Sequence, residues 1–270
     1  MSQYKLGFIG SGAMAEAIMF GVTKSDLYKP QDIIASDVNE NRLLQIAAEL
    51  EVDTIQNNNE VMEKAQVIIL SIKPQHFNAA LDSLKVKPDA GKIVISIAAG
   101  KSISYLQKKL GKIPIIRVMP NTPALVAAGM TALSKGEFAT DEHLEVAEQI
   151  FKSVGKTVRI DESLIDAVTG LSGSGPAYVY QFIEALADGG VQVGIPRKTA
   201  YVLAAQTVIG AGLMVLKTGI HPGELKDMVT SPGGAAIRAV NVLEKAGFRA
   251  TVMDAVEASY LKSKQLGSDD

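Results

Sequence analysis

Residues 5–17 read KLGFIGSGAMAEA, an apolar run that leads through glycines into a stretch with helical spacing. Gly10 allows a sharp turn at the end of the run, and Gly12 has no Cβ to block a close ligand. Ala15 keeps the next helix close to the strand. Because a helix N-terminus attracts phosphate, the stretch predicts a strand–turn–helix unit that holds a dinucleotide pyrophosphate. An ordinary strand-to-helix turn is the alternative.

The composition favours a folded enzyme over a nucleic-acid or membrane-surface protein. The chain has 270 residues, 47% of them apolar, and a formal net charge of −2, so it has no general attraction to polyanions. It contains no cysteine, which excludes thiol catalysis and disulfides. Its histidines, His76, His143 and His221, are far apart in sequence, so we expect no metal site.

Targeting signals are not visible in the sequence. No basic segment precedes an apolar stretch at the start of the chain. The longest apolar stretch, residues 202–216, is shorter than the about 20 residues of a membrane span. We therefore expect a cytoplasmic protein that binds neither membrane nor nucleic acid.

Strand-like and helix-like segments alternate from residue 5 to about residue 160. The candidate strands are residues 6–9, 32–36, 52–55, 67–72, 93–97 and 115–118, and helical spacing lies near 13–24, 40–50, 75–85 and 102–110. Several strands are continuous Val, Ile and Leu runs, as in strands covered on both faces. The alternation predicts an α/β, Rossmann-type doubly wound parallel sheet in a domain of residues 1–160. Residues 129–134 and 157–160 are expected to add edge strands, with a helix over 141–153 between them.

The segments that follow the strands are where a ligand would bind in such a sheet. Ser36, Asp37 and Arg42 follow the second strand. An acid there favours the ribose hydroxyl of NAD, whereas a hydroxyl with an arginine favours the 2′-phosphate of NADP, so local chemistry leaves the two open. After the fourth strand, Pro74 forces an extended turn that presents Lys73. After the fifth strand, the small residues 98–100 leave room for a flat nicotinamide ring. After the sixth strand, Asn121 lies in a loop that two prolines stiffen.

From residue 161 onward helical spacing dominates, which predicts an all-helical second domain, residues 161–270. Apolar residues recur with helical spacing after Pro176, and Gly189-Gly190 is expected to end that helix. A further helix from Ile195-Pro196 to about residue 216 carries interior glycines, each costing about 1 kcal/mol relative to alanine. Such helices need a partner surface, so we expect an intersubunit bundle.

Residues 230–236, TSPGGAA, place glycines and a serine hydroxyl ahead of another helix. Bare N–H groups at such a helix start form a receptor for a small carboxylate. Ordinary helix capping is the alternative interpretation.

Catalytic motifs of hydrolases, metalloproteases and P-loop enzymes are absent from the sequence. A dinucleotide site and an anion site remain, and hydride transfer needs little more, because the cofactor carries the chemistry. Reduction of a ketone normally requires a strong proton donor. A protonated cyclic imine is already electrophilic, so its reduction requires less help from acid–base groups. The shortage of acid–base groups therefore favours an imine substrate.

The chain resembles the pyrroline-5-carboxylate reductases along nearly its whole length. The segments that carry the resemblance are GFIGSGAMA, SIKP, SIAAG, MPNTPA, TGLSGSGPAY, DGGVQVGIPR, HPGELKD, TSPGGAA and GFRATVMDAVEAS. The resemblance implies NAD(P)H-dependent reduction of 1-pyrroline-5-carboxylate to L-proline, the last step of proline biosynthesis. It also implies a homodimer through the C-terminal helices that can assemble further into a decamer.

The resemblance also implies site residues. Those expected to bind NADP, or NAD, are Ile9, Gly10, Ser11, Gly12, Ala13, Met14, Ser36, Asn58, Ser71, Ile72, Lys73, Pro74, Ile97, Ala98, Ala99 and Asn121. Those expected to bind the substrate carboxylate are Ser231, Gly233, Gly234, Ala235 and Ala236. No residue is assigned to proton transfer.

Two positions depart from the family pattern. Ala236 stands where the family usually has a threonine whose hydroxyl meets the substrate nitrogen, so water, Ser231, slower turnover or a related cyclic imine would have to account for it. Asp37 beside Ser36 weakens a strict NADP preference. A β-hydroxyacid dehydrogenase, which would need a lysine on the helix after Pro176, and a non-catalytic dinucleotide sensor are the competing interpretations.

Overall fold

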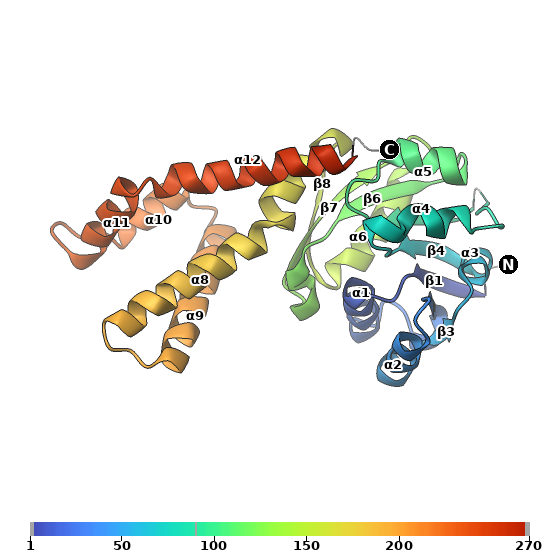
Figure 1. Ribbon diagram of the computed structural model, residues 1–270, viewed down its shortest axis with the longest axis horizontal. Coiled ribbons are helices and arrows are strands. Elements are labelled where there is room, and N and C mark those ends of the chain that lie inside the picture. Colours follow the sequence, from blue (N-terminus) through green and yellow to red (C-terminus); the bar gives the residue numbers. More distant parts are fainter. Residues whose placement is uncertain (1–2, 90, 268–270) are drawn as a thin grey trace. The chain divides into compact units, whose positions relative to one another are not determined.

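The structure, a computed structural model, describes residues 3–89 and 91–267 (Figure 1). Its first part alternates strands and helices. In chain order these are β1 Tyr4–Ile9, α1 Ala13–Lys24, β2 Ile33–Ser36, α2 Glu40–Leu50, β3 Asp53–Ile55, α3 Asn58–Lys64, β4 Ala65–Leu70, α4 Pro74–Asp82, β5 Ile93–Ser96, α5 Ile103–Leu110, β6 Ile115–Met119, β7 Gly129–Lys135, α6 Asp141–Lys152 and β8 Gly155–Arg159. The predicted α/β alternation is confirmed.

The strands form one sheet in the order β3-β2-β1-β4-β5-β6-β7-β8. Strands β1 to β6 are parallel, β7 runs antiparallel to β6, and β8 pairs parallel with β7. The chain reverses its direction across the sheet after β3, and β4 pairs with β1 on its other side. The carboxyl ends of β1 and β4 therefore flank a topological switch point, where ligands bind in open α/β sheets.

Helices cover both faces of the sheet, which explains the continuous apolar strands. One core packs α1, α2 and α6 against it, with Phe8, Ile69 and Phe151 fully buried. The other packs α3, α4 and α5, with Phe77 and Leu106 fully buried. Burial of apolar area on both faces stabilises the sheet at about 25 cal/mol per Å².

The short helix α3 is not expected from sequence spacing. It begins after Asn57, whose side-chain oxygen accepts a hydrogen bond from the Asn59 N–H at 3.0 Å. The ammonium of buried Lys92 donates to the backbone carbonyls of Met62 and Ala65 near its end, at 3.0 and 2.9 Å. A helix this short shows too little apolar periodicity to be predicted, and long-range capping stabilises it.

After β8, two short helical segments, η3 Glu162–Leu164 and α7 Ile165–Val168, lead into a π-helical turn, Thr169–Gly173. The remaining helices are α8 Gly175–Gln192, α9 Arg197–Thr218, α10 Pro222–Met228, α11 Ala235–Lys245 and α12 Phe248–Gly267. The expectation that Gly189-Gly190 would end α8 is wrong, since the helix continues to Gln192. A Cβ on Gly190 would lie 3.3 Å from the Ala200 Cβ, so this glycine allows α8 and α9 to pack closely.

The contacts divide the described chain into two compact units. One comprises the residues up to Gly173 together with those from Ala258 onward, and the other is Ser174–Glu257. The end of α12 belongs to the first unit, where the Ser263 hydroxyl donates to the Asp166 carboxylate at 2.7 Å. The domains of residues 1–160 and 161–270 stay a prediction. The contacts group residues 161–173, which connect β8 to α8, with the unit that contains the sheet.

Helix α9 has a long apolar surface that the described chain leaves largely uncovered. Its length and composition would let it cross a membrane, and only 11% of its most apolar window is buried within the chain. The expectation that this stretch is too short to span therefore does not hold for the observed helix. Cβ atoms on Gly210 and Gly212 would meet nothing within 4 Å, so the expected close packing at these glycines is not made within one chain.

Candidate active site

The loops that follow four strands meet at the carboxyl edge of the sheet. The Gly10 N–H donates to the Ser36 carbonyl at 2.8 Å, and the Ser71 N–H donates to the Ile9 carbonyl at 2.9 Å. The Ile97 N–H donates to the Leu70 carbonyl at 3.2 Å. These bonds bring together the predicted dinucleotide residues that follow β1, β2, β4 and β5.

The glycine loop leaves room for an anion at the start of α1. Gly10 has a φ of +94°, and a Cβ there would lie 2.4 Å from the Ser71 carbonyl oxygen. Gly12, the N-cap of α1, is exposed, and a Cβ there would meet no atom within 4 Å. The first turn of a helix carries N–H groups without intrahelical partners. Open space at these donors fits a dinucleotide pyrophosphate.

Two side chains bind the two backbone polar groups of Ser11, one its N–H and the other its carbonyl. Asp37 accepts a hydrogen bond from the Ser11 N–H at 2.8 Å. The Arg42 Nε donates to the Ser11 carbonyl at 2.7 Å, and its guanidinium pairs with the Glu16 carboxylate. The glycine loop is therefore fixed to α1 and to the segment after β2. Sequence reasoning did not anticipate Glu16, because a single acid on a helix gives no signal.

The residues predicted to meet the adenosine, Ser36 and Asn58, lie at the carboxyl end of β2 and after β3, the two strands beyond β1 in the sheet. The Ser36 hydroxyl is fully buried and lies 2.7 Å from the Asn58 side-chain oxygen and 3.2 Å from the Phe8 carbonyl. A hollow of about 410 Å³ beside Asn58 is lined by Val38, Ile55, Gln56, Asn57, Asn58, Asn59 and Ser83. Its apolar and amide lining suits an adenine or ribose. Because the Ser36 hydroxyl already faces the protein, its contact with the cofactor stays a prediction.

The remaining predicted cofactor residues form the loops after β4, β5 and β6. Lys73 is exposed and extended at the N-cap of α4, and Pro74 begins that helix. Ala98 is buried and Ala99 is half-buried. Asn121 follows β6; its amide oxygen accepts from the Met130 N–H at 2.8 Å and its amide nitrogen donates to the Ser172 carbonyl at 3.0 Å. Asn121 therefore anchors its own loop, and its predicted contact with the nicotinamide stays a prediction.

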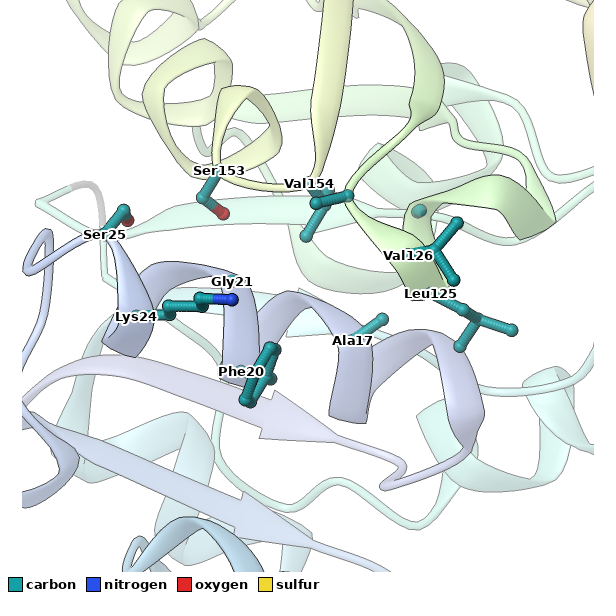
Figure 2. Close-up of a pocket in the computed structure, with 11 residues that line it drawn as sticks. Ala17, Phe20, Gly21, Lys24, Ser25, Leu125, Val126, Ser153 and Val154 are labelled. Atoms are coloured by element: carbon teal, nitrogen blue, oxygen red, sulfur yellow. The ribbon is translucent and has the colours of Figure 1, made fainter. Parts of the chain in front are cut away.

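A separate cavity of about 390 Å³ opens beside α1, as Figure 2 shows. Phe20, Leu125 and Val126 form its apolar wall, and Lys24 and Ser153 add polar groups. None of the predicted cofactor or substrate residues lines it. We therefore assign it no part in the dinucleotide site.

In the second compact unit, the segment before α11 forms the expected glycine turn. Gly233 has a φ of +69°, and the Gly234 N–H donates to the Ser231 carbonyl at 3.0 Å. A Cβ on Gly234 would lie 2.3 Å from the Ser231 hydroxyl oxygen, so glycine is required for the serine to fold over the helix start. Ala235 and Ala236 form the first turn of α11. This arrangement suits a carboxylate.

The grouping of acidic and histidine side chains decides whether the part of the chain that the structure describes could hold a metal. Among the described residues, no group of three or more His, Cys, Asp or Glu side chains is placed to hold a metal ion.

Known proteins match both parts of the chain. A family model for coenzyme F420-dependent NADP oxidoreductases matches residues 5–100, and one for pyrroline-5-carboxylate reductase dimerisation matches residues 162–266. The pyrroline-5-carboxylate reductase of Methanosarcina acetivorans is 47% identical over 268 residues, covering 99% of each chain. The chain belongs to the pyrroline-5-carboxylate reductase family.

Other members of the family agree. The pyrroline-5-carboxylate reductase of Arabidopsis thaliana is 47% identical over 97% of this chain and 95% of its own. A solved structure of Plasmodium falciparum pyrroline carboxylate reductase with NADP bound has a TM-score of 0.87 at 34% identity, covering 99% of both chains. The predicted fold class, the reductase function, its C=N-reducing enzyme class and its use of NAD(P) are confirmed. The matches favour this function over a β-hydroxyacid dehydrogenase or a non-catalytic sensor.

Proposed function

We propose a division of roles between two anion-binding loops for the NAD(P)H-dependent reduction of 1-pyrroline-5-carboxylate to L-proline. The glycine loop from Ile9 to Met14 holds the pyrophosphate. The hollow beside Asn58 takes the adenosine end, and the loops after β4, β5 and β6 take the nicotinamide end. The observation that carries this assignment is the open space over Gly12 at the start of α1.

The turn before α11 is proposed to bind the substrate carboxylate. Its support is the combination of the positive φ of Gly233 with the Ser231 hydroxyl folded over Gly234. Backbone N–H groups at a helix start stabilise a negative charge without introducing a counter-ion. The carboxylate would thereby orient the ring, which lowers the entropic cost of the reaction.

The chain's own residues position the reactants rather than donate a proton. When bound, the reduced nicotinamide supplies the hydride. A protonated cyclic imine is already electrophilic, so no side chain is assigned to proton transfer. Ala236 carries only a methyl group, so the ring nitrogen would be met by water or by the Ser231 hydroxyl, and a related cyclic imine carboxylate is the alternative substrate.

Oxidation of NADPH or NADH at 340 nm with 1-pyrroline-5-carboxylate tests the reaction, and absence of oxidation with both cofactors would contradict it.

Ser231→Ala tests the carboxylate site. Because it removes an interaction made equally in the ground and transition states, it should raise KM for the imine more than it lowers kcat. Ser163→Ala, at an exposed serine outside the proposed site, is the control. An unchanged KM in Ser231→Ala would disprove this site.

The helices of the second unit are proposed to form a homodimer. The match to a dimerisation family and the exposed apolar surface of α9 support this. The same surface explains why α9 resembles a membrane span, so no membrane partner is proposed. Further assembly into a decamer and a preference for NADP over NAD rest on the family resemblance alone, and a cytoplasmic location stays a prediction.

A further inference from the structure

One carboxylate outside the predicted site joins three elements of the first unit. The Glu162 Oε1 accepts a hydrogen bond from the Ile103 N–H, the first residue of α5, at 2.7 Å. The same oxygen lies 3.1 Å from a guanidinium nitrogen of Arg117 on β6. Glu162 itself begins the segment that follows β8. Glu162 lies 59 positions from Ile103 and 45 from Arg117 in sequence, so only the tertiary fold brings it to them.

Arg117 carries a charged side chain that is buried next to the sheet, on β6. Its side chain is only 6% exposed, whereas that of Glu162 is 32% exposed. It lies beside Ser96 on β5 and Ser134 on β7, both buried. Within the described residues, its Nε has no hydrogen-bond partner. A buried arginine is costly without a counter-charge, so Glu162 is what makes Arg117 tolerable there.

The residues that Glu162 joins adjoin two loops of the proposed nicotinamide site. The loop of residues 97–102 ends where α5 begins at Ile103, and Arg117 lies two residues before the end of β6, ahead of Asn121. The segment after Glu162 is also bonded to the second loop, through Asn121 and the Ser172 carbonyl. Loss of the Glu162 carboxylate would free both loops from a common support.

We propose that Glu162 and Arg117 are positioning residues that hold the loops after β5 and β6 in register with each other, and so fix the nicotinamide end of a bound dinucleotide. The inference rests on the proposed role of these loops. Neither residue touches the reacting atoms. The pair sets orientation, to which hydride transfer is sensitive: a displacement of about 1 Å can cost about a hundredfold in rate.

The test compares Glu162→Gln with Asp161→Asn, which makes the same charge change at the exposed neighbouring residue. NADPH is titrated by fluorescence to give the dissociation constant and the number of binding sites, and kcat is expressed per site so that unfolded protein does not count. We expect kcat per site to fall about tenfold in Glu162→Gln. The dissociation constant should change less than twofold, because the pyrophosphate and adenosine contacts remain. Asp161→Asn should match the wild type.

Arg117 provides the second arm. Arg117→Met should reproduce the loss of kcat per site, and Arg117→Lys, which keeps the charge, should recover most of it. If Arg117→Met does not fold, hydrogen exchange in Glu162→Gln replaces it: exchange should rise in residues 97–103 and 117–123 and not in residues 9–16. Equal kcat per site in Glu162→Gln and Asp161→Asn, or exchange rising equally throughout, would overturn the inference. Retained NADPH binding in Gly12→Val would instead overturn the proposed pyrophosphate site, on which the proposed division of roles depends.

Discussion

The Asp37 carboxylate accepts a hydrogen bond from the Ser11 backbone N–H at 2.8 Å. This bond places a negative charge at the end of β2, directly against the glycine loop. A carboxylate at this place suits the ribose diol of NAD and repels the 2′-phosphate of NADP. Arg42 would favour that phosphate, but its guanidinium is already engaged by Ser11, Gln45 and Glu16. The cofactor preference therefore depends on the balance of these charges.

Asp37→Asn should shift the preference toward NADPH. The amide oxygen can still accept from the Ser11 N–H, so the contact with the glycine loop is kept while the charge is lost. The bond that the other carboxylate oxygen accepts from the Asn39 N–H at 2.9 Å is lost with it. We expect kcat/KM for NADPH to rise about tenfold relative to NADH, equivalent to about 1.4 kcal/mol. Steady-state kinetics with both cofactors measures the ratio. An unchanged ratio would show that the Asp37 charge does not face the 2′ position.

Gly12→Val should abolish dinucleotide binding without affecting folding. Apart from the neighbouring residues in the chain, no protein atom lies within 4 Å of a Cβ at this position, and its φ of −66° is open to any residue. The new side chain would occupy the space over the first turn of α1, so the dissociation constant should rise at least about a hundredfold. Fluorescence titration with NADPH measures the loss, and a melting temperature near that of the wild type is the control. Micromolar binding by the variant would contradict the proposed pyrophosphate site.

Glu148 should make folding stability depend on pH in the acid range. Hydrogen bonds from Arg159, and then from Lys152 and Thr157, lower the pKa of Glu148 from its ordinary 4.5 to about 2. Because the folded-state pKa is the lower one, the stabilisation is complete above pH 4.5 and is lost as the pH falls toward about 2. These contacts join α6 to β8 at a partly exposed surface, so their worth at pH 7 is about 1 kcal/mol.

Urea unfolding of Glu148→Gln at pH 7 and at acid pH checks this expectation. The variant should be less stable than the wild type at neutral pH, and the two should converge as the pH approaches 2. Glu145→Gln, on the same helix at an exposed position, should not show this convergence. A constant difference across the pH range would mean that Glu148 stabilises through packing rather than charge.

Helix α9 should lose its partner when a charge is placed on its apolar surface. Ile209 lies mid-helix and is 54% exposed in the single chain. Ile209→Glu would bury an unpaired carboxylate at a subunit interface, which costs several kcal/mol. Light scattering should then report the 28.6 kDa monomer instead of a dimer. Lys217→Glu, near the helix end, is the control, and a wild-type protein that is monomeric at micromolar concentration would refute the interface.

Much of the first unit follows from local sequence. Continuous Val and Ile runs predicted buried parallel strands, and the spacing of Gly10, Gly12 and Ala15 predicted the turn into α1. Both signals are local, because side-chain shape and backbone freedom act within a few residues. The same reasoning missed α3, which long-range capping by Lys92 stabilises, and wrongly ended α8 at Gly189-Gly190. There, packing against Ala200 outweighs the low helix propensity of glycine.

The sequence by itself thus determined the α/β sheet followed by helices, the glycine loop and, through its many ordered motifs, the reductase family. Only the tertiary structure decided how the side chains around the site are engaged. Asp37 and Arg42 both hold Ser11, Ser36 turns its hydroxyl inward to Asn58, and Glu162 meets Arg117 across 45 positions of sequence. Charge pairs and buried hydrogen bonds between distant segments leave no periodicity in the chain, because their partners are chosen by the packing of the whole unit.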